Sequence, residues 1–455
     1  MRRVAKGLRM HSTACRNRFS MKSTFAAPSS HLPRPATLAL VLALTLGSCG
    51  AWSQGSPDTP ALGASPETLI DHARQSNPGF AAARAEALAA QARVTPAGAL
   101  PDPTFELELM DATNTMNGRP ASLLPGQVGE TRYRITQPLP GWGKRDLAVK
   151  AATAQATQAD AMRDAAWAEL AAKIETLWLR YYAAERERAL TREGLTLLQS
   201  LEQLSLARYA LGLLPQQAVL RMQREITAQR LVLVEVEQRR KGLAAGLNGL
   251  LGRAHDAPLA PPDNPAPLPE RLEAAVLFEA AASANPEVNA AGSGIDVASA
   301  ERERTYRDRL PDFAVGVRNN RPDEGKSSWD VMFEVMIPLQ QSSRRAKERE
   351  AEYMLLAAEA RREDARARAS GELGNAWSMY AQGRETLRLL EHTLLPQAQA
   401  TRDASRAALA SGKVDFDSVI EAERQLIDIR TRQLQTELET RLALTEIRKL
   451  TGEFK

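Results

Sequence analysis

Apolar residues recur every three to four positions along most of the chain, the spacing of one face of an α-helix. Between residues 216 and 251, two sets of positions spaced by seven share one side of such a helix: Met222, Gln229, Val236, Leu243 and Leu250, and Ile226, Leu233, Arg240 and Leu247. Most of them are apolar, which is typical of a coiled-coil seam. Similar spacing predicts helices over 66–95 and 144–211. At a rise of ~1.5 Å per residue, the two shorter helices end to end match the longer one.

Four shorter stretches alternate between apolar and polar residues, which predicts β-strands with one apolar and one polar face. They lie around residues 105–109, 132–136, 313–318 and 330–337. Strands of about nine residues suit a tilted crossing of a membrane, but the same pattern also fits a half-buried sheet in a soluble domain. The polar faces carry the charged residues Glu106, Glu108, Arg132, Arg134, Arg318, Asp330 and Glu334.

The whole series of elements occurs twice. SNPGFAAARA at Ser76 returns as ANPEVNAAGS at Ala284, and ALPDPTFELEL at Ala99 returns as RLPDFAVGVRN at Arg309. The helix breaks ALGLLPQQAVL and ASGKVDFDSVI, which begin at residues 210 and 410, also correspond. We therefore predict a first repeat over 66–252 and a second over 271–452. Between them, residues 253–270 contain six prolines and form an extended linker.

Residues 1–48 have the pattern of a secretory signal peptide. Basic residues precede the apolar run ATLALVLALTLG, which is too short to span a bilayer. The run ends in LGSC, which resembles a bacterial lipobox and predicts lipidation of Cys49; ordinary cleavage after Ser53 is the alternative. Residues 49–65 then form an N-terminal tail. Met1, Met10 and Met21 are candidate starts of translation.

Removal of this leader changes the charge and cysteine content. Its eight cations and absent acids mean that the formal net charge falls from +4 to −4, so the basic composition is no argument for nucleic-acid binding. Cys15 also lies in the leader, which leaves at most one cysteine and no intrachain disulfide. No later run of about 18 apolar residues predicts a transmembrane helix.

A secreted chain without a transmembrane helix favours the membrane interpretation of the strands. Four strands do not close a barrel, whereas twelve from three chains do. We therefore expect a mostly α fold with transmembrane β-structure: a long α-helical coiled-coil barrel, and four strands per chain that complete a 12-stranded barrel as a trimer. The charged residues of the strands would then face the barrel lumen.

No motif of catalysis or of cofactor binding stands out. The sequence has no phosphate-binding Gly-x4-Gly-Lys-Ser/Thr loop and no zinc-protease helix, and the segment around Ser293 lacks the spacing of a nucleophile elbow. His72, His255 and His392 lie far apart, and no Cys/His cluster suits a soft metal. Met332 and Met336 share the polar face of their strand, where methionine is a common filler. We expect no enzyme activity, no cofactor and no resident metal.

The duplicated order of helix, two strands, long helix, turn and helix resembles the TolC family of outer-membrane efflux channels over residues 66–452. ALPDPTFELEL, TQPLPGWGKR and the paired helix breaks look most like its CzcC-like heavy-metal branch. The resemblance implies a homotrimer in outer-membrane lipid with a helical tunnel in the periplasm. It also implies a periplasmic adaptor (membrane fusion protein) and an inner-membrane pump of the resistance-nodulation-division (RND) type.

The resemblance carries over to two sets of residues. The hairpin tips that would dock the adaptor are Leu211, Gly212, Leu213 and Leu214, and Ser411, Gly412, Lys413 and Val414. The family's best-known member has two carboxylates, three residues apart, that ring its periplasmic gate. The matching positions are Ser418, which departs from the pattern, and Glu421; Asp415 and Asp417 lie one turn away. Alternatively, these carboxylates only stabilise the start of a helix.

The expected function is the exit duct of a tripartite efflux system for heavy-metal cations. A duct of the same architecture for drugs or other small organic molecules is the alternative. A periplasmic coiled-coil scaffold with a soluble sheet is an alternative of a different class.

Overall fold

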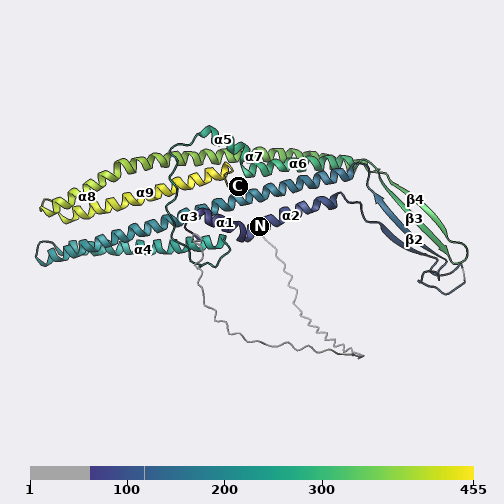
Figure 1. Ribbon diagram of the computed structural model, residues 1–455, viewed down its shortest axis with the longest axis horizontal. Helices are drawn as coiled ribbons and strands as arrows, with labels where there is room; N and C mark the ends of the chain where they lie inside the picture. The colour runs from purple at the N-terminus through teal and green to yellow at the C-terminus, as the bar shows by residue number, and fades with distance from the viewer. Residues whose placement is uncertain (1–61, 117, 455) are drawn as a thin grey trace, which may run out of the picture. The chain divides into compact units, whose positions relative to one another are not determined.

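The computed structural model describes residues 62–116 and 118–454 (Figure 1). The predicted signal peptide, Cys49 and most of the predicted tail lie outside the described residues, so they stay predictions. The first half contains α1 (Pro66–Ser76), α2 (Pro78–Ala97), β1 (Thr104–Met110), β2 (Glu130–Leu139), α3 (Lys144–Ala210) and α4 (Gln216–Leu250). The second half contains α5 (Ala274–Ala284), α6 (Pro286–Arg307), β3 (Asp312–Pro322), β4 (Ser328–Met336), α7 (Gln341–Leu389), the π-helical turn η1 (Leu390–Leu394), α8 (Leu395–Ala410) and α9 (Phe416–Leu450). The expected mostly helical fold with four strands is confirmed.

The helix expected over 66–95 is two helices, because an Asn-Pro pair separates them. Asn77 has an extended backbone, which is the conformation favoured before proline, and Pro78 begins α2. The Asn77 side chain accepts a hydrogen bond from Phe80 N and donates one to Leu250 O, at 2.8 and 2.7 Å. The break therefore caps α2 and joins it to the end of α4.

The second repeat contains the same junction. Asn285 precedes Pro286, and its side chain accepts bonds from the backbone of Glu287 and Val288. Its Nδ2 donates to Leu450 O, at the end of α9, over 3.0 Å. The duplication seen in the sequence thus extends to individual hydrogen bonds.

The helices lie side by side along the long helix α3 (Figure 1). Both α2 and α4 pack along α3, and α3, α6 and α7 are neighbours in turn. The coiled-coil seam predicted on α4 faces α3, with Met222, Val236 and Leu247 fully buried. The sheet joins one end of these helices, and the two helical hairpins, α3–α4 and α8–α9, end at the other.

The long helical tract of the second repeat is not continuous. After α7, residues 390–394 form the π-helical turn η1, and α8 begins at Leu395. Pro396 lies at the start of α8 and has no backbone N–H to donate to the preceding turn. This missing donor accounts for the local change in hydrogen bonding, and α3 has no equivalent proline in its interior.

One cluster of the hydrophobic core lies where the linker packs against the helices. Leu69, Ile174, Trp178 and Leu251 are buried together, and Leu259 of the linker packs against them. The Trp178 indole N–H donates to Gly63 O over 2.9 Å. The linker has no helix between residues 253 and 273, as its prolines predict. Within the described residues, every helix is too short or too polar to serve as a bilayer span.

Candidate channel surfaces

The four strands form one antiparallel sheet in the order β1-β2-β3-β4. Directly paired residues lie on the same face of a sheet, so the register defines the two faces. One row runs Glu106, Arg134, Arg318 and Asp330 across all four strands, and the next contains Glu108 and Arg132. Glu334 lies on this face through its pairing with Ala314. All seven charged positions predicted to share a face therefore do so.

Many charges on this face are paired across strands. Arg134 contacts Glu106 at 2.9 Å, and Arg318 contacts Asp330 at 2.7 Å. Arg132 contacts Glu108 of β1 at 3.7 Å and also Glu130 of its own strand at 3.1 Å. The charged face is thus a network of ion pairs along the sheet.

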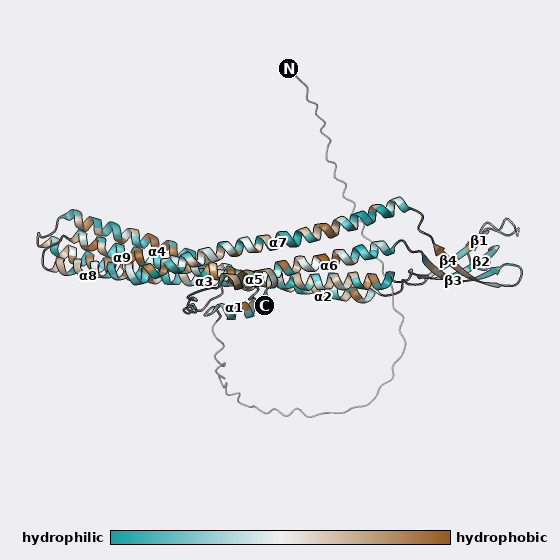
Figure 2. Cartoon of the chain, turned by 90° about the horizontal axis from the view of Figure 1, so that it is seen from above, coloured by the Kyte–Doolittle hydropathy of each residue, from teal (hydrophilic) through white to brown (hydrophobic). Residues whose placement is uncertain are grey.

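The opposite face is mostly apolar and is exposed in the single chain; its polar residues include Gln137, Asn319 and Arg321. One of its rows is Phe105, Ile135, Val317 and Val331, and these side chains are 65%, 55%, 42% and 64% exposed. Phe333 on the same face is 80% exposed. Hydrophobic residues of β3 and β4 are coloured brown in Figure 2. A continuous exposed apolar surface of this kind indicates contact with lipid or with another protein.

Aromatic residues frame the apolar face at both ends. Tyr133 and Trp329 share one row near the loop end of the sheet, and Trp329 is 72% exposed. At the helix end, Trp142 is 82% exposed, and its ring lies 5.5 Å from that of Phe313. Such aromatic girdles are typical of transmembrane strands. The sequence analysis did not identify this frame, although the tryptophans next to the alternating stretches were a signal for it.

The two hairpin tips share one turn geometry. Gly212 and Gly412 have φ values of +70° and +73°, in the left-handed region that favours glycine at the end of a helix. The residue after each glycine donates its N–H to the helix five residues back: Leu213 to Arg208 O and Lys413 to Ala408 O, both at 2.9 Å. The two breaks are therefore equivalent in backbone structure and differ in side chains.

The tip residues predicted to dock an adaptor fall into two groups. Leu211 and Leu213 are 73% and 72% exposed, and Ser411 and Lys413 are also exposed. Leu214 and Val414, at matching positions, instead pack against a cluster shared by both hairpins. Its buried members are Leu198, Met222, Ile226, Leu409, Phe416 and Val419. Leu214 and Val414 thus have a structural role in holding the tips together.

Three of the four predicted gate residues are engaged within the chain. Asp415 is the N-cap of α9 and accepts bonds from Ser418 N and Ser418 Oγ, at 3.1 and 2.6 Å. The Ser418 hydroxyl bond holds the pKa of Asp415 below its usual value. Asp417 forms an ion pair with Arg221 of α4 at 2.5 Å. The helix-start alternative therefore describes Asp415.

Glu421 has no ion pair with any cation of the described residues; it accepts only a hydrogen bond from Gln425, at 3.3 Å. Glu421 belongs to a polar stripe along α9. The exposed positions Ser418, Glu421, Gln425, Asp428, Arg432, Gln435 and Glu439 repeat every seven residues on one side of the helix. This stripe is a candidate lining for a water-filled passage.

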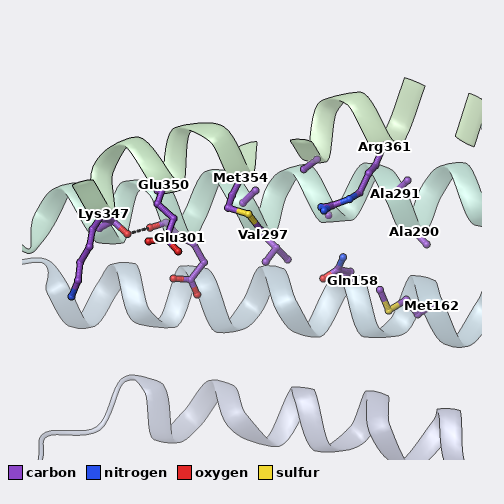
Figure 3. A pocket seen from close by; sticks show the side chains of 15 residues that line it. Gln158, Met162, Ala290, Ala291, Val297, Glu301, Lys347, Glu350, Met354 and Arg361 are labelled. Atoms are coloured by element: carbon purple, nitrogen blue, oxygen red, sulfur yellow. Dashed lines mark hydrogen bonds between the residues drawn. The ribbon is translucent and has the colours of Figure 1, made fainter. Parts of the chain in front are cut away.

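A groove of about 650 Å³ lies along α6 (Figure 3). Small residues line it on α6, including Ala290, Ala291 and Gly294, and Met162 of α3 and Met354 of α7 contribute from either side. The lining is mostly apolar, although the charged side chains of Glu301, Lys347, Glu350 and Arg361 also border the groove. Elsewhere in the described residues, no group of three or more His, Cys, Asp or Glu side chains could hold a metal ion.

The sequence profile of the family described as outer membrane efflux protein matches residues 69–253 and again residues 277–453. The chain belongs to this family. Its members are transport ducts that catalyse no reaction. No curated protein matches the sequence.

Solved outer-membrane channels have the same fold. The outer-membrane channel OprN has a TM-score of 0.72 with 19% identity, covering 85% of this chain and 89% of OprN. The outer membrane protein VceC of Vibrio cholerae has a TM-score of 0.71 with 16% identity, covering 85% and 96%. The MtrE outer membrane channel of Neisseria gonorrhoeae, in its open state, has a TM-score of 0.68 with 16% identity, covering 86% and 89%.

Proposed function

We propose that this protein is the outer-membrane exit duct of a tripartite efflux system and that it exports heavy-metal cations. The observation that carries this proposal is the sheet, with a continuous apolar exposed face opposite a network of charged residues. In a water-filled membrane barrel, the apolar face contacts lipid and the charged face lines the lumen. The aromatic residues at both ends of the apolar face support the same orientation.

The assembly we propose is a homotrimer. The sheet of one chain has two free edges, β1 and β4, and unpaired edge groups are not tolerated in a bilayer. Three sheets provide twelve strands, an even number that closes a barrel. The helices also carry apolar side chains that one chain leaves exposed, such as Leu88 on α2, Leu231 on α4 and Leu356 on α7. Neighbouring chains would cover them.

At the opposite end, the hairpin tips would dock a periplasmic adaptor, which joins the duct to an inner-membrane RND pump. Leu211 and Leu213 are the strongest candidates, because they are large apolar residues exposed on a turn. Ser411 and Lys413 give the second tip a polar surface. Threefold symmetry would place three tips of each kind around the periplasmic end.

Glu421 is the proposed gate carboxylate. It is exposed, it lies one turn from the start of α9, and it has no cationic partner in the described part of the chain. Three copies around a threefold axis would form a ring of negative charge that attracts cations. Asp417 is the weaker candidate because Arg221 neutralises it.

The charged face of the sheet supports a cationic cargo. Apart from Asp312, the first residue of β3, this face holds five carboxylates and three guanidinium groups. They are Glu106, Glu108, Glu130, Asp330 and Glu334, and Arg132, Arg134 and Arg318. A lumen with excess negative charge raises the local concentration of cations. Export of drugs or other small organic molecules is the alternative for the same duct.

The test is complementation of a deletion strain with the wild type, Val331→Arg or Met332→Arg. These neighbours lie on opposite faces of β4, so the same charge is added to the apolar face or to the polar face. An arginine in the lipid costs about 2–4 kcal/mol near the bilayer midplane. We expect trimers in the outer membrane with the wild type and Met332→Arg, and few or none with Val331→Arg.

The same strains test the cargo. We expect the deletion to lower tolerance to zinc, cobalt or cadmium and the wild type to restore it. A loss of drug tolerance with metal tolerance unchanged would overturn the metal cargo alone. Recovery of the wild-type protein in a soluble periplasmic fraction, or equal behaviour of the two arginine variants, would refute the membrane duct.

A further inference from the structure

The junction between the sheet and the helices has an exposed apolar rim. Trp142, in the turn between β2 and α3, is 82% exposed. Beyond the end of β4, Ile337 and Leu339 are 65% and 81% exposed. These residues end the apolar face of the sheet on the side of the helices. If the proposed duct is correct, this rim lies where the hydrocarbon of the membrane meets the lipid headgroups.

Cations surround this rim. They come from the first turn of α3, the last turn of α6 and the first turns of α7, which all begin or end at the sheet. Two of them are neutralised within the chain: Lys144 pairs with Asp312 at 2.8 Å, and Arg309 pairs with Glu348 at 2.5 Å. Among the described residues, no carboxylate forms an ion pair with Arg145, Arg307, Arg344, Arg345, Lys347 or Arg349.

Two of these guanidinium groups border the turn that carries Trp142. The guanidinium of Arg307 lies against Gly143, so close that a Cβ atom there would be 2.6 Å from its Nη2. Arg344 donates from Nη1 to Asp308 O in the neighbouring turn, and its Nε is buried without a partner. Arg345 follows on α7; it is exposed, forms no ion pair with the described residues, and acts on Glu348 only at longer range.

We propose that Arg307, Arg344, Arg345 and Trp142 form a binding collar for anionic phospholipid in the membrane leaflet that faces the helices. The guanidinium groups bind the phosphodiester, because Arg presents paired donors that match phosphate oxygens. The indole of Trp142 lies among the upper acyl chains, the position that tryptophan favours at membrane interfaces. A phospholipid supplies both the anion and the apolar chain that this surface needs. The inference rests on the proposed membrane duct.

The test is a titration of the purified trimer in detergent with phosphatidylglycerol or phosphatidylcholine, followed by native mass spectrometry. Each cation near an anionic lipid surface contributes about fivefold in affinity. For the wild type we expect a preference for phosphatidylglycerol of about tenfold or more, which weakens as salt is added. We expect Arg307→Gln with Arg344→Gln to remove most of this preference.

Arg345→Gln is the second variant, because Arg345 is exposed and forms no ion pair with the described residues, and Glu348, the carboxylate that feels its charge, is already paired with Arg309. We expect it to lower the preference about fivefold. Arg361→Gln is the matched control on α7, four to five turns farther from the sheet, and should bind as the wild type does. Addition of inorganic phosphate should displace little lipid, since phosphate lacks the acyl chains.

Equal binding of the two lipids by a wild-type trimer overturns the collar. A preference that Arg345→Gln and Arg361→Gln retain equally also overturns it, as does full displacement of the lipid by inorganic phosphate. These outcomes leave the duct itself intact. Failure of the duct would appear earlier, as a wild-type protein that forms no trimer in the outer membrane.

Discussion

At the scale of single residues, the junctions between the helices of each repeat depend on close backbone contact. In the second repeat, Gly452 follows α9 with a φ of +74°, and a Cβ atom on it would overlap the carbonyl oxygen of Ala284. Gly412 at the hairpin tip has nearly the same φ, +73°, but open space around it. The two glycines therefore share the same conformational demand and differ in packing.

This difference gives a direct prediction. Gly412→Ala should cost about 1–2 kcal/mol, the strain of a left-handed alanine. Gly452→Ala should cost clearly more, because the added methyl group also collides with the Ala284 carbonyl. This collision would push α5 and α9 apart. Thermal unfolding of the two purified variants, followed by circular dichroism, compares them. Equal losses of stability would show that the junction yields to the added methyl group.

Sequence analysis predicted neither the junctions nor their bonds, since it expected one continuous helix over 66–95. The Asn-Pro pairs were visible as repeated segments, and a proline marks the first turn of a helix. The side-chain amides of Asn77 and Asn285, however, bond to Leu250 and Leu450, which are 173 and 165 positions away in the chain. Such contacts depend on where α4 and α9 lie in the folded protein, and local sequence patterns carry no information on that.

At the scale of elements, the strands were the most predictable part. Their period of two identified both faces, and the register confirms that the seven charged positions share one of them. The tips were less predictable, because a run such as Leu211, Leu213 and Leu214 does not reveal which leucine is buried. The structure separates them: Leu214 packs into the cluster, and the other two are exposed.

The tips therefore have a sharper test than their sequence alone suggests. We predict that Leu211→Asp with Leu213→Asp abolishes export and leaves the trimer intact. Both side chains are exposed, and neither packs into the buried cluster that Leu214 and Val414 contact. Leu220→Asp is the control, since Leu220 is 56% exposed on α4, beyond the turn. Export is measured in the complemented strain and trimer content in the outer-membrane fraction.

Two results would contradict adaptor docking by these leucines. Loss of the trimer would mean that Leu211 and Leu213 are needed for folding or assembly. Full export by the double variant would mean that the first tip makes no essential contact.

At the scale of the whole molecule, several ion pairs join the two repeats, and one of them involves a buried carboxylate. Glu175 of α3 contacts Arg448 of α9 at 2.8 Å and accepts a hydrogen bond from Thr445 at 3.2 Å. The carboxylate is buried, and burial raises its pKa above the usual 4.5 in spite of the attraction of Arg448. The folded protein thus holds a proton on Glu175 more tightly than the unfolded chain does.

The pH dependence follows from this difference in proton affinity. The contribution of Glu175 to the free energy of unfolding is largest below pH 4.5 and decreases as pH rises through the raised pKa. Glu175→Gln keeps a hydrogen-bonding side chain and removes this decrease. We therefore predict that the stability of Glu175→Gln relative to the wild type improves as pH rises from about 4.5. Parallel unfolding temperatures of both proteins across this range would show that Glu175 titrates normally.

The equal length of the two return helices has a consequence for how such a duct can change. Both α4 and α9 span 35 residues, and both end at an Asn-Pro junction. Because the two helices have the same length, they place the two tips at the same distance from the Asn-Pro junctions. Removal of seven residues from each of the two helices of one hairpin would shorten that hairpin by about 10 Å and leave the other tip in place. The lengths of the two hairpins can therefore change only together. A partner that contacts both tips would thus also constrain insertions and deletions in each repeat.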